Sequence, residues 1–279
     1  MGKYKNDHVN ENLAHLKQKK LFLFDIDGTI ALSEDVLDGT MDLLAYIKKI
    51  GGRAIYITNK SSKSTADYVK KFERMGIEAE DDDFLTAGSY TLSYLLKHHV
   101  TDKIFVMATA SYYNELKKND LCVTTDCDAS VDIVLTAFDT ELTYEKVEKA
   151  CRLLMDPKKE RIWLATNADL RCPVDFGMIP DCGSICNMLQ AATDRTPQYL
   201  GKPSPGLADY SMEMTGFSKE ETLVVGDRIY TDIACGENAG VETCLVLTGE
   251  AKREDVEDAD NRIDFCFPSV RELYEALTC

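Results

Sequence analysis

The chain has 279 residues, 44% of them hydrophobic, and a formal net charge of −16. This length can bury one large core or two smaller ones, and we expect two domains. The negative charge argues against nucleic acid and against anionic membrane as partners, since both are bound by clusters of Lys and Arg. An anionic substrate would therefore need a local lysine or a metal ion.

Ten cysteines could suggest a disulfide scaffold. The chain is long, however, and its first residues lack an apolar signal-peptide core, so we expect reduced cysteines and a cytoplasmic protein. The closest cysteine pairs, Cys122 with Cys127 and Cys182 with Cys186, lack zinc-site spacing. No apolar run is long enough to cross a bilayer.

The stretch from Leu21 to Ile30 is the one around which the other motifs are arranged. Its apolar half predicts a buried strand of a parallel sheet, and Asp25 and Asp27 follow at the carboxyl end. Gly28 permits a sharp turn there. An isolated DxDGT stretch would be no more than an acidic turn, so a catalytic role for it requires further motifs elsewhere in the chain.

The first 82 residues predict one part of a core domain. Residues 1–19 are polar and lysine-rich, and we expect a loosely docked helix. After the first strand, the pattern predicts a helix that ends at Gly51, a strand over 53–57 and a helix over 64–75. This alternation of strand and helix is typical of an α/β fold with a doubly wound parallel sheet.

Residues 83–195 contain a further alternation of expected strands and helices, which predicts an inserted α/β domain. The expected helices cover 90–98, 112–118, 143–154 and 184–192, and the expected strands cover 104–108, 121–124, 131–135 and 161–165. We expect the segment 166–173 to be a loop.

Residues 196–279 predict the return to the core domain. The rigid loop Gly201-Lys202-Pro203 precedes a helix over 207–214, and a strand over 222–225 leads to Asp227 and Asp232. The remaining elements are a helix containing Ala234, strands over 242–247 and 263–265, and a helix over 270–277.

Polar groups therefore follow several predicted strands. They are Asp25, Asp27, Thr58, Asn59, Lys202, Asp227 and Asp232. Because parallel strands point their carboxyl ends to one side, these groups can converge in a single crevice. Clustered carboxylates repel unless a cation lies among them, and hard oxygen ligands favour Mg²⁺. A lysine and a hydroxyl would complete a site for a phosphoryl group.

The ordered motifs FDIDGT, ITN, GKPSP and VVGDRIYTD resemble the four motifs of the haloacid dehalogenase superfamily. The position of the insertion is similar to that in its NagD-like and 4-nitrophenyl phosphatase branch, whose α/β cap lies between the second and third motifs. The resemblance covers nearly the whole chain from about residue 20. It implies a Mg²⁺-dependent phosphomonoester hydrolase that acts on small phosphorylated metabolites through an aspartyl phosphate.

The resemblance also implies the roles of individual residues. Asp25 would be the nucleophile and Asp27 the general acid and base. Thr58 and Asn59 would bind phosphoryl oxygens, and Lys202 would neutralise charge. The metal site would comprise the carboxylates of Asp25 and Asp227, the backbone carbonyl of Asp27 and, in the second shell or through water, Asp232. In the cap loop, the resemblance suggests Asp169, Arg171 and Cys172 as residues facing the leaving group.

Several alternatives stay open. Asp232 could cap the following helix, Lys60 could contact phosphate or face solvent, and Arg228 could form an ion pair or bind substrate. Arg171 would suit a substrate with a second anionic group.

Two other functions are compatible with these motifs. A phosphotransferase or phosphomutase could use the same intermediate, and a retained fold could serve as a non-catalytic phospholigand-binding module. The resemblance leaves a homodimer through the cap open, and the physiological substrate is not readable from the sequence.

Overall fold

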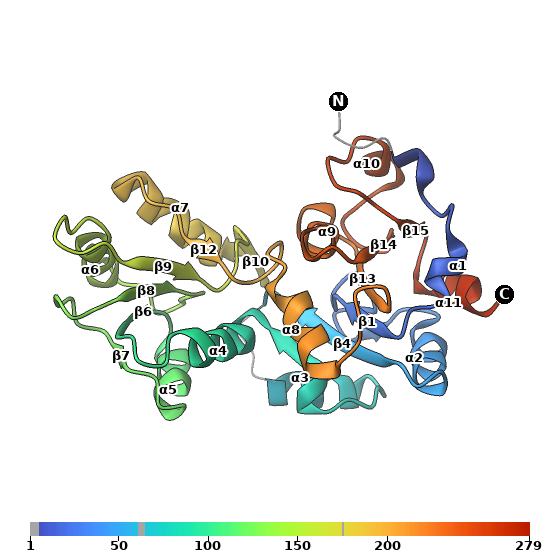
Figure 1. Cartoon of the computed structure of the whole chain (residues 1–279), viewed down its shortest axis with the longest axis horizontal. Helices are drawn as coiled ribbons and strands as arrows, with labels where there is room; N and C mark the ends of the chain where they lie inside the picture. The colour runs from blue at the N-terminus through green and yellow to red at the C-terminus, as the bar shows by residue number, and fades with distance from the viewer. Residues whose placement is uncertain (1–5, 61–64, 175) are drawn as a thin grey trace. The chain divides into compact units, whose positions relative to one another are not determined.

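The computed structural model describes residues 6–60, 65–174 and 176–279. The chain divides into two compact units, of which the first, here the core unit, comprises Met1–Thr58, Lys63–Thr86 and Lys202–Cys279. The second, here the inserted unit, comprises Asn59–Ser62 and Ala87–Gly201. Each is an α/β unit with a parallel sheet, as expected from the sequence (Figure 1).

The core unit is built on a six-stranded parallel sheet in the order β15-β14-β13-β1-β4-β5. The strands are β1 (Leu21–Phe24), β4 (Arg53–Thr58), β5 (Phe84–Thr86), β13 (Thr222–Gly226), β14 (Glu242–Val246) and β15 (Phe265–Phe267). Strand β1 lies between β13 and β4, where Leu21 pairs with Thr222 on one side and with Arg53 on the other. The DxDGT turn is thus placed at the middle of the sheet.

Helices cover both faces of this sheet. One face carries α2 (Thr40–Lys49), α3 (Thr65–Arg74) and α11 (Val270–Thr278), whose apolar side chains join Phe22, Phe24 and Val225 in one buried cluster. The helices α8 (Gly206–Thr215) and α9 (Ala234–Ala239) contact each other and the strands β1 and β14 on the other face. A strand buried on both faces needs the continuous apolar run that β1 has.

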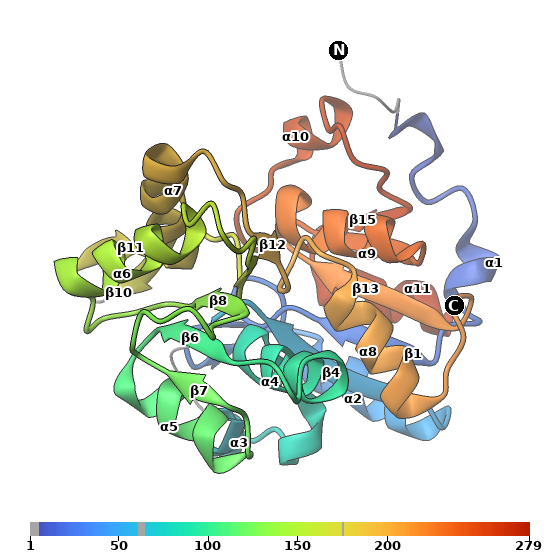
Figure 2. The same ribbon diagram turned by 60° about the vertical axis from the view of Figure 1, so that its left-hand side comes forward.

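The inserted unit has a five-stranded parallel sheet in the order β12-β9-β8-β6-β7. Its strands are β6 (Ile104–Met107), β7 (Val123–Thr124), β8 (Ile133–Thr136), β9 (Ile162–Ala165) and β12 (Gln198–Tyr199). The helices α6 (Tyr144–Leu154) and α7 (Cys182–Thr193) lie on one side, and α4 (Ala87–His98) and α5 (Ala110–Lys118) lie on the other (Figure 2).

Several expected boundaries were wrong. Residues 84–86 pair with β4 as β5 and so belong to the core sheet, whereas 198–199 pair with β9, so the change of unit falls near 87 and 201 in place of 83 and 196. The last strand is Phe265–Phe267, two residues later than expected, because Phe265, Cys266 and Phe267 pair with β14. The role of the inserted unit as a cap stays a prediction.

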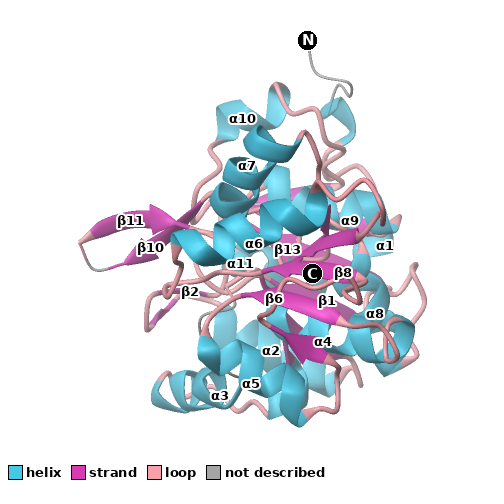
Figure 3. Ribbon diagram, turned by 90° about the vertical axis from the view of Figure 1, so that its left-hand side faces the viewer, coloured by secondary structure: helices cyan, strands magenta, loops and turns pink. Residues whose placement is uncertain are grey.

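Two hairpins were missed. The expected loop at 166–173 runs into β10 (Arg171–Val174), which pairs with β11 (Gly177–Pro180) as an antiparallel hairpin drawn as a separate ribbon in Figure 3. A short pair, β2 (Ala31–Leu32) with β3 (Asp35–Val36), follows the DxDGT turn. Pro173 and Pro180 lie within this hairpin, and both of its strands are edge strands, where proline is tolerated.

The N-terminal segment is more firmly attached than its polar composition suggests. Its described part has a 3₁₀ turn, η1 (Asn6–His8), and a short helix, α1 (Leu13–Leu16). The side chain of Asn10 donates to the carbonyl of Cys266 at 2.9 Å, and buried Lys19 pairs with Glu242 at 2.7 Å. The remaining elements are η2 (Asp81–Asp83), η3 (Ile229–Ile233) and α10 (Arg253–Glu257). No described helix combines the length and apolarity that a membrane span requires.

Candidate active site

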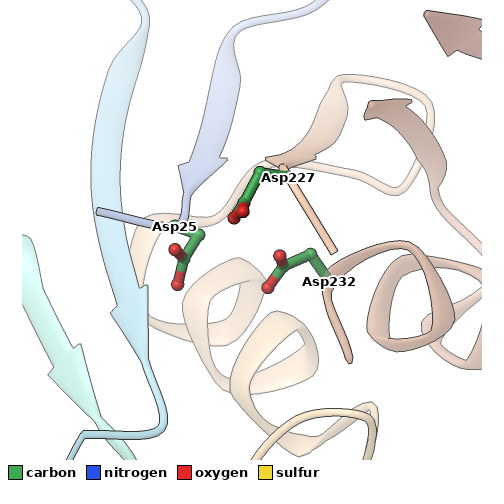
Figure 4. Close-up of side chains that lie close together, drawn as sticks. All are labelled: Asp25, Asp227 and Asp232. Carbon is green, nitrogen blue, oxygen red and sulfur yellow. The ribbon is translucent and has the colours of Figure 1, made fainter. Parts of the chain in front are cut away.

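The carboxyl edge of the core sheet brings the acidic residues of two motifs together. Asp25 follows β1, Asp227 follows the neighbouring strand β13, and Asp232 lies in η3, a π-helical turn after β13. One carboxylate oxygen from each of the three lies within 4.8 Å of the others. Figure 4 shows the three side chains gathered around a common space. The convergence expected from parallel strand ends is thus found for these three residues.

Lys202 supplies a positive charge to this cluster. Its Nζ donates to Oδ1 of Asp25 at 2.6 Å and to Oδ1 of Asp232 at 2.7 Å, and also to the carbonyl of Ile57 at 3.2 Å. The lysine side chain is 3% exposed. A buried ammonium needs such partners, so Lys202 is fixed between the two carboxylates and is not an ordinary surface lysine.

Burial and charge shift the pKa values of the cluster. Burial raises the pKa of Asp25 to about 7, with further contributions from Asp232 and Asp227, although the ammonium of Lys202 acts against the rise. Burial also raises the pKa of Asp227. For Lys202, burial opposes the charged form, but Asp232 and Asp25 outweigh it and raise its pKa. The site as it stands therefore has more negative charge than its own residues neutralise.

The environment of Asp227 fits a hard cation. Its Oδ2 accepts the backbone N–H of Glu250 at 2.7 Å, whereas its buried Oδ1 has no hydrogen-bond partner among the described residues. The backbone of Gly249 lies directly against this carboxylate, since a Cβ atom added to Gly249 would lie 2.0 Å from Oδ2 of Asp227. Glycine at this position therefore allows the close approach. An unsatisfied buried oxygen beside two further carboxylates is the donor set that Mg²⁺ or a similar ion takes.

Asp27 follows Asp25 by two residues in the turn after β1, but its carboxylate is not part of the cluster of Asp25, Asp227 and Asp232. Its side chain is 49% exposed, and its Oδ1 accepts a hydrogen bond from Nζ of Lys71 on α3 at 3.1 Å. Its backbone is part of a tight turn, in which the N–H of Gly28 bonds the carbonyl of Ala31 at 2.8 Å. Lys71 was missed by the sequence analysis.

Thr58 ends β4 in the same unit and is buried. Its side chain hydrogen-bonds the hydroxyl of Tyr68 on α3, whose pKa is raised by burial. The same face of α3 therefore contacts two of the residues expected in the site. The spacing of Tyr68, Lys71 and Phe72 is helical and was a usable signal that Lys71 points inward.

The structure groups Asn59 with the inserted unit. Its side-chain amide donates to Oδ1 of Asp169 at 3.0 Å, and its carbonyl accepts from the amide of Asn167 at 3.1 Å. Oδ1 of Asn167 in turn accepts the backbone N–H of Asp169 at 2.9 Å. Asn167, which the sequence analysis did not single out, therefore links Asn59 to the loop that carries Asp169.

Asp181 is a buried carboxylate of the inserted unit. It caps α7 by accepting the backbone N–H of Cys182 at 2.6 Å. Burial raises its pKa to about 6, with a smaller contribution from Asp169, while Asn167 and the positive charge of Lys60 act against the rise. This residue was also missed, although an aspartate just before a helix is a usual capping signal.

Other expected residues of the inserted unit have different surroundings. Arg171 opens β10 and is exposed, whereas Cys172 is buried beside it. Lys60 is half-buried, and its charge acts on Cys172 as well as on Asp181.

Contacts in the core unit bear on two of the open alternatives. Asp232 does not cap α9, whose first turn has no side-chain cap, and its Oδ2 instead accepts the backbone N–H of Arg228 at 3.1 Å. Arg228 forms an ion pair with Glu250 at 3.0 Å.

Comparisons with known proteins show which family the chain resembles. Residues 22–122 match the family model of haloacid dehalogenase-like hydrolases, and residues 199–273 match a second model of HAD-like hydrolases. An acid sugar phosphatase of Staphylococcus aureus is 29% identical over 262 residues, which cover 94% of this chain and 99% of the relative.

Solved structures show the same likeness. The 4-nitrophenylphosphatase of Thermotoga maritima has a TM-score of 0.85 at 37% identity, and the match covers 94% of this chain and 99% of that one. NagD of Escherichia coli K-12 has a TM-score of 0.82 at 29% identity, with 91% and 98% covered. The chain therefore belongs to the haloacid dehalogenase-like hydrolases, as a phosphatase of their NagD-like branch.

Proposed function

We propose that the protein is a Mg²⁺-dependent phosphomonoester hydrolase that acts on small phosphorylated metabolites through an aspartyl phosphate on Asp25. One observation carries this proposal: the carboxylate of Asp25 is bonded to buried Lys202 and lies within a cluster of acidic oxygens. Lys202 favours the ionised form of this carboxylate, and an ionised carboxylate can act as a nucleophile.

The metal would be held by residues of the core unit. Asp25 and Asp227 would supply carboxylate oxygens, and Asp27 would supply its backbone carbonyl. The two oxygens of Asp232 are bonded to Lys202 and to the backbone of Arg228, so Asp232 would hold the neighbouring groups in place without binding the metal directly. When bound, Mg²⁺ supplies charge neutralisation for the phosphoryl group.

The reaction would proceed in two steps at Asp25. Its carboxylate forms a bond to phosphorus as the bond to the leaving oxygen breaks, and Asp27 donates a proton to that oxygen. Asp27 then removes a proton from a water molecule that attacks the aspartyl phosphate, which releases inorganic phosphate and restores Asp25. Lys202 stabilises the negative charge on Asp25 and on the transferred group, and Thr58 and Asn59 bind phosphoryl oxygens.

The substrate class is proposed from the relatives. One is named an acid sugar phosphatase and another a 4-nitrophenylphosphatase, and both names point to phosphate esters of small molecules. We therefore expect activity on sugar phosphates and on 4-nitrophenyl phosphate.

The test is phosphate release from a panel of small phosphomonoesters with Mg²⁺ or with EDTA. Wild type is compared with Asp25→Asn and with Asp35→Asn, a control that alters an exposed carboxylate on β3. We expect metal-dependent release that is lost in Asp25→Asn and kept in Asp35→Asn. No release unless an acceptor alcohol is added would instead support a phosphotransferase, and no turnover under any condition would support a binding module.

A further inference from the structure

Lys71 is a buried cation with no established role. It lies on the inner face of α3 between Tyr68 and Phe72, both of which belong to the apolar cluster of the core unit. The lysine side chain is 8% exposed. Lysine is seldom buried without a partner, because removing an ammonium group from water is costly.

The partner of Lys71 is Asp27. Nζ of Lys71 lies 3.1 Å from Oδ1 of Asp27, and among the described residues Asp27 is the one carboxylate in ion-pair range of this lysine. Asp27 itself is half exposed. The two residues come from different segments, one from helix α3 and the other from the turn after β1, so their contact depends on the folded core.

Stability alone does not account for this pair. An ion pair with one half-exposed member contributes little to stability, and an apolar side chain would suit the inner face of α3 at least as well. The position of Lys71 is more readily explained by what it does to Asp27.

Its effect is to fix one oxygen of the carboxyl group. Lys71 binds Oδ1, while Oδ2 of Asp27 has no hydrogen bond among the described residues. The backbone of Asp27 is already held by the turn between Gly28 and Ala31. With the main chain and Oδ1 both fixed, Oδ2 has a defined position from which to exchange a proton, and proton transfer depends on such a fixed geometry.

We propose that Lys71 is a positioning residue for Asp27, which it orients as the proton donor to the leaving group. This inference rests on the proposed function, and it adds a residue from α3 to a site otherwise built from strand ends. Tyr68 on the same helix face bonds Thr58, so α3 contacts two groups of the site.

The choice of substrate separates positioning from a merely structural role. The phenolate of 4-nitrophenyl phosphate leaves without a proton, whereas the alkoxide of a sugar phosphate needs one. The ratio kcat/KM reports steps only up to the first irreversible one, which is the transfer to Asp25. Loss of a positioned acid therefore lowers kcat/KM for alkyl phosphates and spares the nitrophenyl ester.

The experiment compares Lys71→Met with Lys71→Arg and with Lys70→Met, which alters the adjacent, exposed lysine of the same helix. For a sugar phosphate we expect Lys71→Met to lower kcat/KM by roughly 100-fold, the lower end of the usual effect of a general acid, and for 4-nitrophenyl phosphate by less than about threefold. Lys71→Arg should recover part of the loss, and Lys70→Met should match wild type.

A second measurement tests whether Lys71 acts through Asp27. In an Asp27→Asn background, the change of Lys71 to Met should have no further effect on either substrate, because the two residues act through one group. Equal losses on both substrates, or additive losses in the double variant, would overturn the positioning role while leaving the phosphatase proposal intact. An inactive wild type would instead mean that the proposed function fails.

Discussion

Nζ of Lys202 donates to Oδ1 of Asp25 at 2.6 Å, although the two residues are separated in the chain by the entire inserted unit. The same ammonium bonds Asp232, so its removal would leave two buried carboxylates without their counter-charge. We expect Lys202→Met to lower kcat by about 100- to 1,000-fold, since one preorganised contact to the transition state is of that order. Lys202→Arg should not restore activity, because the buried space is shaped for a single ammonium.

Steady-state kinetics with 4-nitrophenyl phosphate would check this expectation, with the melting temperature as a control for folding. A Lys202→Met enzyme that keeps more than a tenth of the wild-type kcat would show that Asp25 does not depend on this lysine.

Mg²⁺ affinity is expected to depend on pH through Asp25. Burial raises the pKa of Asp25 to about 7, and a metal binds only its deprotonated form. The apparent affinity should therefore weaken by about tenfold for each pH unit below 7 and level off above pH 8. Calorimetric titration with MgCl₂ at pH 6 and pH 8 would measure this.

The variants Asp25→Asn and Asp227→Asn provide the comparison for that titration. Both should bind Mg²⁺ weakly, and the pH dependence due to Asp25 should be missing from the first and kept in the second. Equal wild-type affinities at pH 6 and pH 8 would contradict the expectation.

Asp181 should make the inserted unit less stable as pH rises. Burial raises its pKa from 3.8 to about 6, so the folded state binds a proton that the unfolded state has already lost between those values. Stability is then lost as pH rises from about 4 to 6, and the ionised carboxylate costs up to about 3 kcal/mol above that window.

Asp181→Asn removes the charge and keeps a good helix cap. We expect the variant to melt at a higher temperature than wild type at pH 7.5, with a smaller difference at pH 5. Thermal unfolding at the two pH values measures this, and a variant less stable than wild type at pH 7.5 would show that the charged form is the favoured one.

Arg171 is expected to favour substrates with a second anionic group. It is exposed at the start of β10, beside the loop of Asp169. Arg171→Ala should lower kcat/KM for phosphoglycolate about tenfold relative to that for 4-nitrophenyl phosphate, since a lost charged hydrogen bond costs at least 1.4 kcal/mol or so. Arg152→Ala, which alters another exposed arginine of the inserted unit, is the control. Unchanged relative rates in Arg171→Ala would remove Arg171 from substrate recognition.

The sequence predicted the parts of this structure that follow from local patterns. The continuous apolar run of β1 and the four ordered motifs were enough to predict a parallel sheet and the convergence of Asp25 with Asp227, because strand ends in such a sheet share one edge. Residues whose partners are far away in the chain were harder to find. The helical spacing indicates that Lys71 points inward, but its partner Asp27 is known only from the folded core. The role of Asn167 follows only from its bond to the backbone of Asn59.

The hairpin β10–β11 was missed for another reason. Short strands carry few residues from which a period can be recognised, and the two prolines removed the usual signs of a strand. The boundaries at 87 and 201 depend on which sheet accepts β5 and β12, and strand pairing of this kind is a long-range property.

The pairing of β1 with β13 also has a consequence for the order in which the protein acquires its structure during synthesis. Leu21 pairs with Thr222, about 200 residues further along the chain, so the central pair of the core sheet cannot form until most of the polypeptide has been made. The inserted unit is nearly continuous in sequence and is complete earlier. We therefore expect the inserted unit to fold first on the ribosome, while β1, which leads to Asp25, has β4 but not yet β13 as a neighbour.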